Sequence, residues 1–351
     1  MMSKCHKCQT LPMIPSDEAK VYIIFEHELL LQKMRELLKV LGYKYSEEED
    51  AIIIECSNFR LFLENLYERS NFSSPERNGI LVLVLGKDEK LTIGSFKRAK
   101  PLDTWFSIIE AEEYLSILEE GRLVVYFQPI VSYDLKVIGQ ECLIRGVKSD
   151  GSLLPPLTLF RLAEKTNTLF YLDRACREAS IKTAALKSLY DLMIFINFTP
   201  SSIYDPAFCL QTTVSWVNHF GFNPSMVVFE VVESQKIEDV KHLGNILDYY
   251  RQNGFRVALD DVGSGYSNLE MLVNLRPDIV KIEKEIVRNV NYDSLKQSIV
   301  SALVRICKEA NIKSLAEGVE TKDEFEYLKD KVDYFQGFLI SKPSSEPVRV
   351  L

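Results

Sequence analysis

Long apolar runs, an excess of basic residues and a cysteine framework are all missing from this sequence of 351 residues. A transmembrane helix needs about 20 predominantly apolar residues, and no stretch of the sequence reaches that length. Lysine and arginine number 42 against 50 aspartates and glutamates, which gives a net charge of -8. This balance argues against a broad surface for long nucleic acid, although a small anionic ligand held through metal ions remains compatible with it.

The seven cysteines are too scattered to form a disulfide framework. Cys5 and Cys8 form a lone C-x-x-C without the second ligand pair that a zinc ribbon needs, so an inert terminus is the favoured interpretation. The opening residues, MMSKCHKCQT, lack the apolar core of a secretory signal. We therefore expect a reducing, cytoplasmic location.

The composition, 46% hydrophobic and 26% charged, supports a large packed core. In residues 1–110, short apolar runs alternate with helical periodicity, which predicts a small α/β domain. Its expected elements are strands at 21–25, 51–56 and 80–85, helices at 29–41 and 59–69, a loop at 70–79 and a further hairpin strand at 90–96.

From residue 111 to residue 351, strand and helix patterns alternate regularly, which predicts an α/β fold of the (β/α)8 TIM-like barrel type. The first two strand patterns are so close in sequence that a hairpin should join them, so the first strand is expected to run antiparallel. The expected strands are residues 123–128, 137–143, 192–197, 226–230, 256–260, 279–282, 313–317 and 334–336, with helices at 172–189, 239–252 and 295–310.

Polar side chains stand at or near the ends of six of these strands. Polar groups that follow buried apolar runs are costly unless they are paired or bound to metal. Because all parallel strands of a barrel open onto one face, residues far apart in sequence should converge there. The set is Glu141, Asn197, Glu230, the pair Asp260 and Asp261, Lys281 and Glu317.

This set has the chemistry of a two-metal phosphodiester site. Carboxylate and amide oxygens suit Mg²⁺ or Mn²⁺, and two such ions about 3.5–4 Å apart could share a water and clamp a phosphodiester. Lys281 would contact a phosphoryl oxygen, and Glu317 is the best candidate for the base that takes a proton from the water. The oxygen donors are Glu141, Asn197, Glu230, Asp260 and Asp261.

Each residue alone has a simpler interpretation. A single acid at a strand end is more often a helix cap, and Asp261 could cap the helix that begins near residue 266. Lys281 and Glu320, taken singly, would be solvated surface side chains. Because six strands of one barrel have polar residues at or near their ends, a shared two-metal site is favoured over separate explanations for each residue.

At these residues the sequence resembles the EAL-domain family, phosphodiesterases of the bacterial messenger cyclic di-GMP. The resemblance extends from about residue 112 to residue 343, with the motifs in the family's order. They are YFQPIV at Tyr126, ECLIR at Glu141, INFTPSSI at Ile196, FEVVES at Phe229, DDVGSGYSNL at Asp260, DIVKI at Asp278, AEGVET at Ala316 and QGFLISKP at Gln336.

The resemblance implies hydrolysis of cyclic di-GMP to linear pGpG with two Mg²⁺ or Mn²⁺ ions per site. Ca²⁺ is expected to be inhibitory, because its looser coordination positions water poorly. It assigns the ions to the five oxygen donors, and catalytic roles to Lys281, Glu317 and Glu233, the last of which would steady the loop after the paired aspartates. A catalytically silent domain that senses the nucleotide or docks a protein is the alternative. The residues expected to bind substrate are Gln128, Arg145, Gln336 and Glu320.

The sequence departs from the family pattern at Cys142, where alanine is usual, and at Val262 and residues 340–341 near the substrate rim. Strand alternation predicts that Cys142 faces away from Glu141. In this family an appended domain usually senses a signal or sets the dimer, so residues 1–110 are interpreted as regulatory by analogy alone.

We also expect a homodimer through the segment Tyr266 to Arg276. Leu269, Leu272 and Val273 form a stripe there at helical spacing. Ordinary packing of this stripe against the barrel is the alternative.

Overall fold

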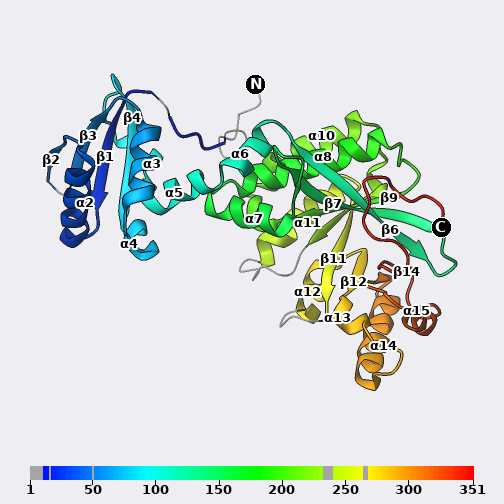
Figure 1. The fold of residues 1–351 in the computed structure, drawn as a ribbon. Helices are drawn as coiled ribbons and strands as arrows, with labels where there is room; N and C mark the ends of the chain where they lie inside the picture. Colours follow the sequence, from blue (N-terminus) through cyan, green and yellow to red (C-terminus); the bar gives the residue numbers. More distant parts are fainter. Residues whose placement is uncertain (1–10, 16, 50, 232–239, 264–267) are drawn as a thin grey trace. The chain divides into compact units, whose positions relative to one another are not determined.

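The structure is a computed structural model that describes residues 11–15, 17–49, 51–231, 240–263 and 268–351. The chain divides into two compact units, residues 1–120 with 157–171, and residues 121–156 with 172–351 (Figure 1). Helices α6 (Glu112–Glu119) and α7 (Pro156–Lys165) belong to the N-terminal unit, where the Tyr114 hydroxyl lies 2.8 Å from Thr168 Oγ1.

The N-terminal unit is built on an antiparallel sheet with strand order β2-β3-β1-β4-β5. Alternate residues of β1, from Ala19 to Phe25, are buried in one apolar core with the inner faces of α2 and α3. The order β-α-β-β-α-β is that of a split β-α-β fold. The elements are β1 (Ala19–Phe25), α2 (Glu28–Leu41), β2 (Ser46–Glu48), β3 (Ala51–Cys56), α3 (Phe59–Arg69), α4 (Ser74–Asn78), β4 (Ile80–Gly86), η1 (Ile93–Arg98), β5 (Lys100–Pro101) and α5 (Leu102–Glu110).

Two local predictions in this unit are wrong. The expected hairpin strand at 90–96 is instead occupied mainly by the 3₁₀ helix η1, and the strand on the outer edge of β4, opposite β1, is the short β5. The expected loop at 70–79 contains helix α4, because Ser73 and Glu76 form a capping box and Pro75 lies in the first turn. Both errors concern short elements that caps and turns specify more strongly than hydrophobic periodicity does.

The second unit contains a closed eight-stranded barrel, with strand order β6-β14-β13-β12-β11-β10-β9-β7 and closure through the β6–β7 pair. Strand β6 is antiparallel to both of its neighbours, so the antiparallel first strand is confirmed. The remaining neighbours, from β7 round to β14, are parallel.

Helices and short 3₁₀ turns separate most of the barrel strands (Figure 1). The elements are β6 (Leu123–Ser132), β7 (Val137–Val147), β8 (Leu153–Leu154), α8 (Leu169–Leu186), β9 (Met193–Phe198), η2 (Pro200–Ser202), α9 (Pro206–Cys209), α10 (Gln211–His219), η3 (Pro224–Met226), β10 (Val227–Val231), α11 (Val240–Gln252), β11 (Arg256–Val262), α12 (Asn268–Leu275), β12 (Ile279–Ile282), α13 (Lys284–Val287), α14 (Ser294–Glu309), β13 (Lys313–Ala316), α15 (Lys322–Leu328) and β14 (Tyr334–Phe335).

The barrel interior has an apolar layer and, nearer the carboxyl ends of the strands, a polar layer. The apolar layer includes Phe195, Val228, Ala258, Ile279 and Leu315, which form one buried cluster. Residues two positions apart in a strand share a face, so the next inward residues of the same strands are polar. These are Asn197, Glu230, Asp260, Lys281 and Glu317.

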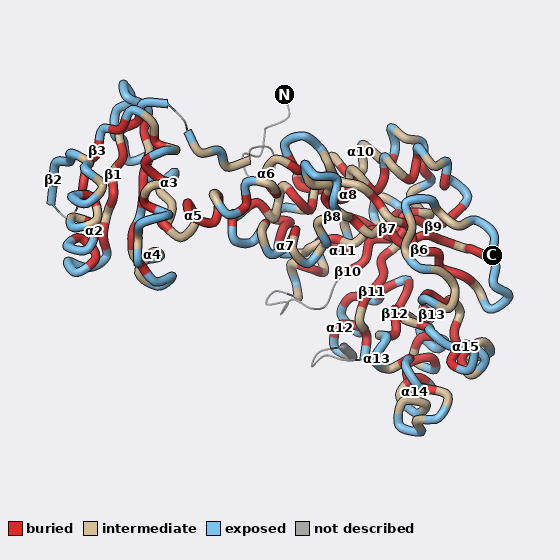
Figure 2. The backbone as a smooth tube through the Cα atoms, in the orientation of Figure 1, coloured by how far each residue is buried: buried red, intermediate tan, exposed pale blue. Residues whose placement is uncertain are grey.

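Figure 2 shows the buried residues running along the strands of both units. Within the described ranges, no helix combines the length and the apolar character needed to cross a bilayer.

Candidate metal-binding active site

Lys281 lies at the centre of the polar layer, and its side chain is 1% exposed. Its Nζ is 2.7 Å from Glu317 Oε1, 2.8 Å from Glu230 Oε1 and 3.2 Å from Asp260 Oδ1, and a fourth carboxylate oxygen, Glu141 Oε2, lies at 3.8 Å. Although burial alone would lower the pKa of Lys281, these carboxylates raise it well above its ordinary value. The lysine is therefore a fixed positive charge.

Glu141 is held by hydrogen bonds from side chains on two other strands or strand ends. Asn197 Nδ2 donates to Glu141 Oε1 at 3.0 Å, and Gln336 Nε2 donates to Glu141 Oε2 at 2.7 Å. Gln128, the register partner of Glu141 on β6, lies 3.4 Å from Gln336 Nε2 and donates to the Ser341 carbonyl. Burial would raise the pKa of Glu141, but Lys281 and the amide donors lower it below its usual range. Glu141 is thus an oriented, ionised carboxylate.

Glu230 is fully buried beside Asn197, its register partner on β9. Its Oε1 forms the 2.8 Å ion pair with Lys281 Nζ, and its Oε2 is buried. Burial raises the pKa of Glu230 well above its ordinary value; Lys281 opposes the rise, and Glu141 and Asp260 add to it. Such a carboxylate has unused capacity for a cation.

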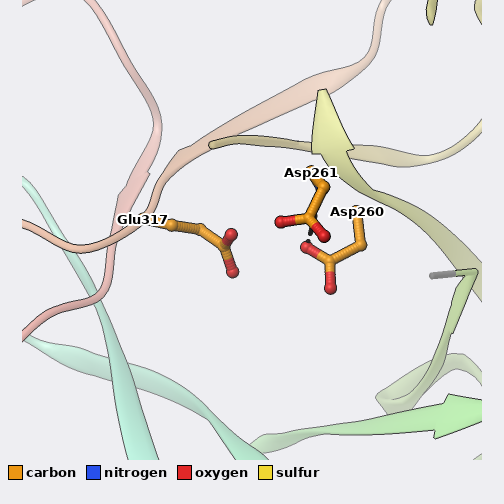
Figure 3. Close-up of side chains that lie close together, drawn as sticks. All are labelled: Asp260, Asp261 and Glu317. Atoms are coloured by element: carbon orange, nitrogen blue, oxygen red, sulfur yellow. Dashed lines mark hydrogen bonds between the residues drawn. The ribbon is translucent and has the colours of Figure 1, made fainter. Parts of the chain in front are cut away.

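Asp260 and Asp261 reach the same pocket although neighbouring strand residues normally point to opposite faces. The pairing of β11 with β12 shifts register between Leu259 and Val262, and Asp261 adopts a left-handed backbone with φ of 53°. This bulge turns the second aspartate toward the first. One oxygen from each aspartate and one from Glu317 lie within 4.8 Å of one another, and Figure 3 shows the three carboxylates facing a common space.

Glu317 follows β13, and its backbone N–H donates to the Ile282 carbonyl at 3.1 Å. Burial raises its pKa to about 8; Lys281 opposes this rise, while Asp260 and Glu141 add to it. The pKa of Asp261 is also raised, by burial and by its neighbours Asp260 and Glu283. Four carboxylates therefore share one ammonium and Asp261 lies beside two of them, which is the electrostatic environment that divalent cations neutralise.

The substrate-binding candidates differ in position. Gln128 and Gln336 contact the cluster as described above. Arg145 lies four residues beyond Glu141 on β7, with its guanidinium 5.6 Å from the centre of the Tyr126 ring. Glu320 is not brought into the cluster, since its exposed carboxylate pairs with Arg288 at 3.2 Å. Glu233 lies outside the described residues.

One acidic residue near the site was missed in the sequence analysis. Glu283, two residues after Lys281, has a buried oxygen, Oε2, without a hydrogen bond in the described structure, and its charge raises the pKa of Asp261. Strand periodicity offered the signal, because residues 281 and 283 share a face. The prediction for Cys142 is confirmed: it is buried and hydrogen-bonded to Ser180 of α8, and burial raises the pKa of its thiol.

Comparison with known proteins identifies this arrangement. The sequence of the chain matches the family model of the EAL domain over residues 111–343. The chain belongs to the EAL-domain family. The resemblance inferred from the ordered motifs is thereby confirmed.

Relatives and solved structures agree with this family. The probable cyclic di-GMP phosphodiesterase PdeG of Escherichia coli K12 is 29% identical over 249 residues, which cover 69% of this chain and 49% of PdeG. The cyclic di-GMP phosphodiesterase PdeR of the same bacterium is 30% identical over 231 residues, covering 64% of this chain and 34% of PdeR. The chain thus spans about half or less of these relatives.

Among solved structures, a standalone EAL protein from Vibrio cholerae O395 in its c-di-GMP-bound form matches with a TM-score of 0.59 and 33% identity, covering 65% of this chain and 95% of that one.

Proposed function

We propose that this EAL-family protein hydrolyses cyclic di-GMP to linear pGpG with the help of two divalent cations. The observation that carries the proposal is the convergence of five carboxylates around one buried ammonium at the barrel mouth. The nucleotide is inferred from the relatives named cyclic di-GMP phosphodiesterases and from the c-di-GMP bound to the Vibrio cholerae structure.

The residues present fit Mg²⁺ or Mn²⁺. Every proposed ligand offers oxygen, and the fully buried Glu230 shares the cation Lys281 with three other carboxylates. When bound, the cations would act as Lewis acids toward water and the phosphodiester and neutralise the developing charge. The proposed ligands are Glu141, Asn197, Glu230, Asp260 and Asp261.

The chain's own groups supply the remaining steps. Glu317 takes a proton from the attacking water as the water oxygen bonds to phosphorus and the bond from phosphorus to the ribose 3′ oxygen breaks. A proton from solvent completes the 3′-hydroxyl, and the phosphate stays on the 5′ oxygen. Lys281, 2.7 Å from Glu317, supplies a fixed positive charge toward the phosphoryl oxygens. Gln128 and Gln336 orient Glu141, and Arg145 is proposed to contact a phosphate or guanine.

Chromatography of the nucleotide after incubation tests this function. Purified protein with Mg²⁺ or Mn²⁺ should convert cyclic di-GMP to pGpG, and EDTA should stop the reaction. Ca²⁺ should permit binding without turnover, because its looser coordination positions water poorly. Nucleotide that binds but stays cyclic with every metal tried would instead favour the silent sensor.

We further propose that the protein is a homodimer through α12 and that the N-terminal unit regulates it. The stripe expected there is revised: Leu272 is buried within its own chain, whereas the Val273 side chain is 72% exposed. Leu269 belongs to the part of α12 whose side chains lie outside the described residues. Because α12 follows the strand that carries Asp260 and Asp261, a contact on it could alter the positions of both aspartates.

A further inference from the structure

A second buried ion pair lies away from the candidate metal ligands, on helix α8. Asp173 and Arg177 are four residues apart, and both side chains are 2% exposed. Asp173 Oδ2 accepts hydrogen bonds from Arg177 Nη2 at 2.7 Å and Nε at 3.1 Å. Arg177 Nη1 also donates to Thr213 Oγ1 on α10. The two charges are thus satisfied by each other and by groups fixed on neighbouring elements.

The other oxygen of Asp173 reaches the end of strand β9. Asp173 Oδ1 accepts the backbone N–H of Thr199 at 2.8 Å. Thr199 is two residues beyond Asn197, and it caps the 3₁₀ helix η2 that follows. Asn197 in turn donates its side-chain Nδ2 to Glu141 Oε1 at 3.0 Å. A short chain of contacts therefore connects the buried ion pair to two proposed metal ligands.

Stability alone does not explain this pair. Removing two charges from water is expensive, and apolar residues of similar volume often replace a buried ion pair without loss of stability. A neutral acceptor would also satisfy the Thr199 N–H. What the pair adds is an acceptor with a fixed location, because Arg177 orients the carboxylate through two donors and is itself held by Thr213.

We propose that Asp173, oriented by Arg177, is a positioning residue that holds the Thr199 backbone and thereby sets the place of Asn197 in the metal site. This inference rests on the proposed function only in that Asn197 is taken as a metal ligand. Asp173 touches neither substrate nor metal. Its effect reaches the site through the two residues of backbone from Thr199 back to Asn197 and then through the Asn197–Glu141 contact.

Two double variants of the full chain separate positioning from stability. D173N/R177M keeps an oxygen acceptor at position 173 and removes both charges. D173L/R177M removes the charges and the acceptor while keeping a similar volume. Isothermal titration with Mn²⁺ alone, thermal unfolding, and the kcat and KM for cyclic di-GMP are measured for both variants and for the wild type.

We expect D173L/R177M to bind Mn²⁺ about 10- to 100-fold more weakly than D173N/R177M, the usual range for groups that orient a ligand, with similar unfolding temperatures. The KM should change less than kcat. Equal Mn²⁺ affinities in the two folded variants would overturn the inference.

Hydrogen exchange of the wild type covers the case in which D173L/R177M fails to fold. The Thr199 amide should exchange as slowly as the core of β9, and fast exchange there would also overturn the inference. Absence of turnover in a wild type that binds Mn²⁺ would instead refute the proposed hydrolysis and leave the comparison between variants valid.

Discussion

The two units of the chain differ in where their charged side chains lie. In the N-terminal unit, the described ion pairs lie at the surface, as between Lys33 and Glu76 or Arg77 and Asp103, with at least a quarter of each side chain exposed. Among the described residues, every charged side chain that is buried belongs to the barrel unit. These are Glu141, Asp173, Arg177, Glu230, Asp260, Lys281 and Glu324.

This difference shows which unit contains buried charges that lower the stability of the fold. Both units have sheets with apolar inner faces, so hydrophobic burial does not separate them. Buried carboxylates that share a single ammonium are unfavourable for folding, and a site of this kind is retained when it binds or reacts. The buried charges therefore point to the barrel as the unit with the reactive site, whereas the core of the N-terminal unit is apolar.

The largest effect should come from Glu317→Gln. The substitution keeps the shape of the side chain and removes the proton acceptor, so turnover of cyclic di-GMP should fall about 10²- to 10⁴-fold. Nucleotide binding, measured by titration calorimetry, should persist. Glu326→Gln, which alters an exposed glutamate paired with Lys329, is the matched control and should retain activity. Full turnover in Glu317→Gln would show that the base is another group.

Replacing lysines in the two units should separate buried from exposed charge. In metal-free protein, Lys281→Met leaves several buried carboxylates without their cation, and the free energy of unfolding should fall by about 3–5 kcal/mol. Lys33→Met removes an exposed partner of Glu76 and should leave denaturant unfolding almost unchanged. Equal losses in the two variants would remove the distinction between the units.

Metal binding should depend on pH because protons bind within the same carboxylate cluster, both at the proposed ligand Glu230 and at Glu317 beside the proposed ligands Asp260 and Asp261. In the metal-free protein, burial raises the pKa of Glu317 to about 8 and that of Glu230 well above its usual range. Below these pKa values the groups carry protons, so Mn²⁺ affinity should rise from pH 6 to pH 8, by about tenfold per pH unit for each proton displaced. Calorimetry in buffers of different ionisation enthalpy measures the protons released. A constant affinity across this range would contradict the assignment.

Much of the barrel site could be predicted from the sequence because strand periodicity is strong there. The inward positions of Glu230, Asp260 and Lys281 follow from the two-residue repeat. The approach of Asp261 could not be derived in that way, since a regular strand would point it outward and only the bulge with its left-handed backbone brings it in.

Other features depend on tertiary contacts that no local pattern encodes. Asp173 reads as one polar position on a helix, and its partner Thr199 is 26 residues away. Likewise, η1 and α4 are set by short capping interactions rather than by periodicity. The apolar stripe on α12 was predicted from spacing, but the structure shows that Leu272 and Val273 differ in burial.

The smallest effect concerns assembly, and it tests whether a dimer contact on α12 of the barrel unit is coupled to catalysis. Leu272→Glu would place a charge inside the chain's own core, so it would confuse unfolding with dissociation. Val273→Glu instead alters an exposed position on α12 and should weaken the proposed dimer while the barrel stays folded. Leu295→Glu, at a similarly exposed position on α14, is the matched control.

Light scattering and turnover measured on one sample of each variant should show dissociation and a several-fold loss of activity for Val273→Glu alone. The loss is modest because the ligands remain and only the population of the aspartate positions shifts. A monomeric wild type with undiminished turnover would remove the coupling between assembly and catalysis, and the catalytic assignment would stand without it.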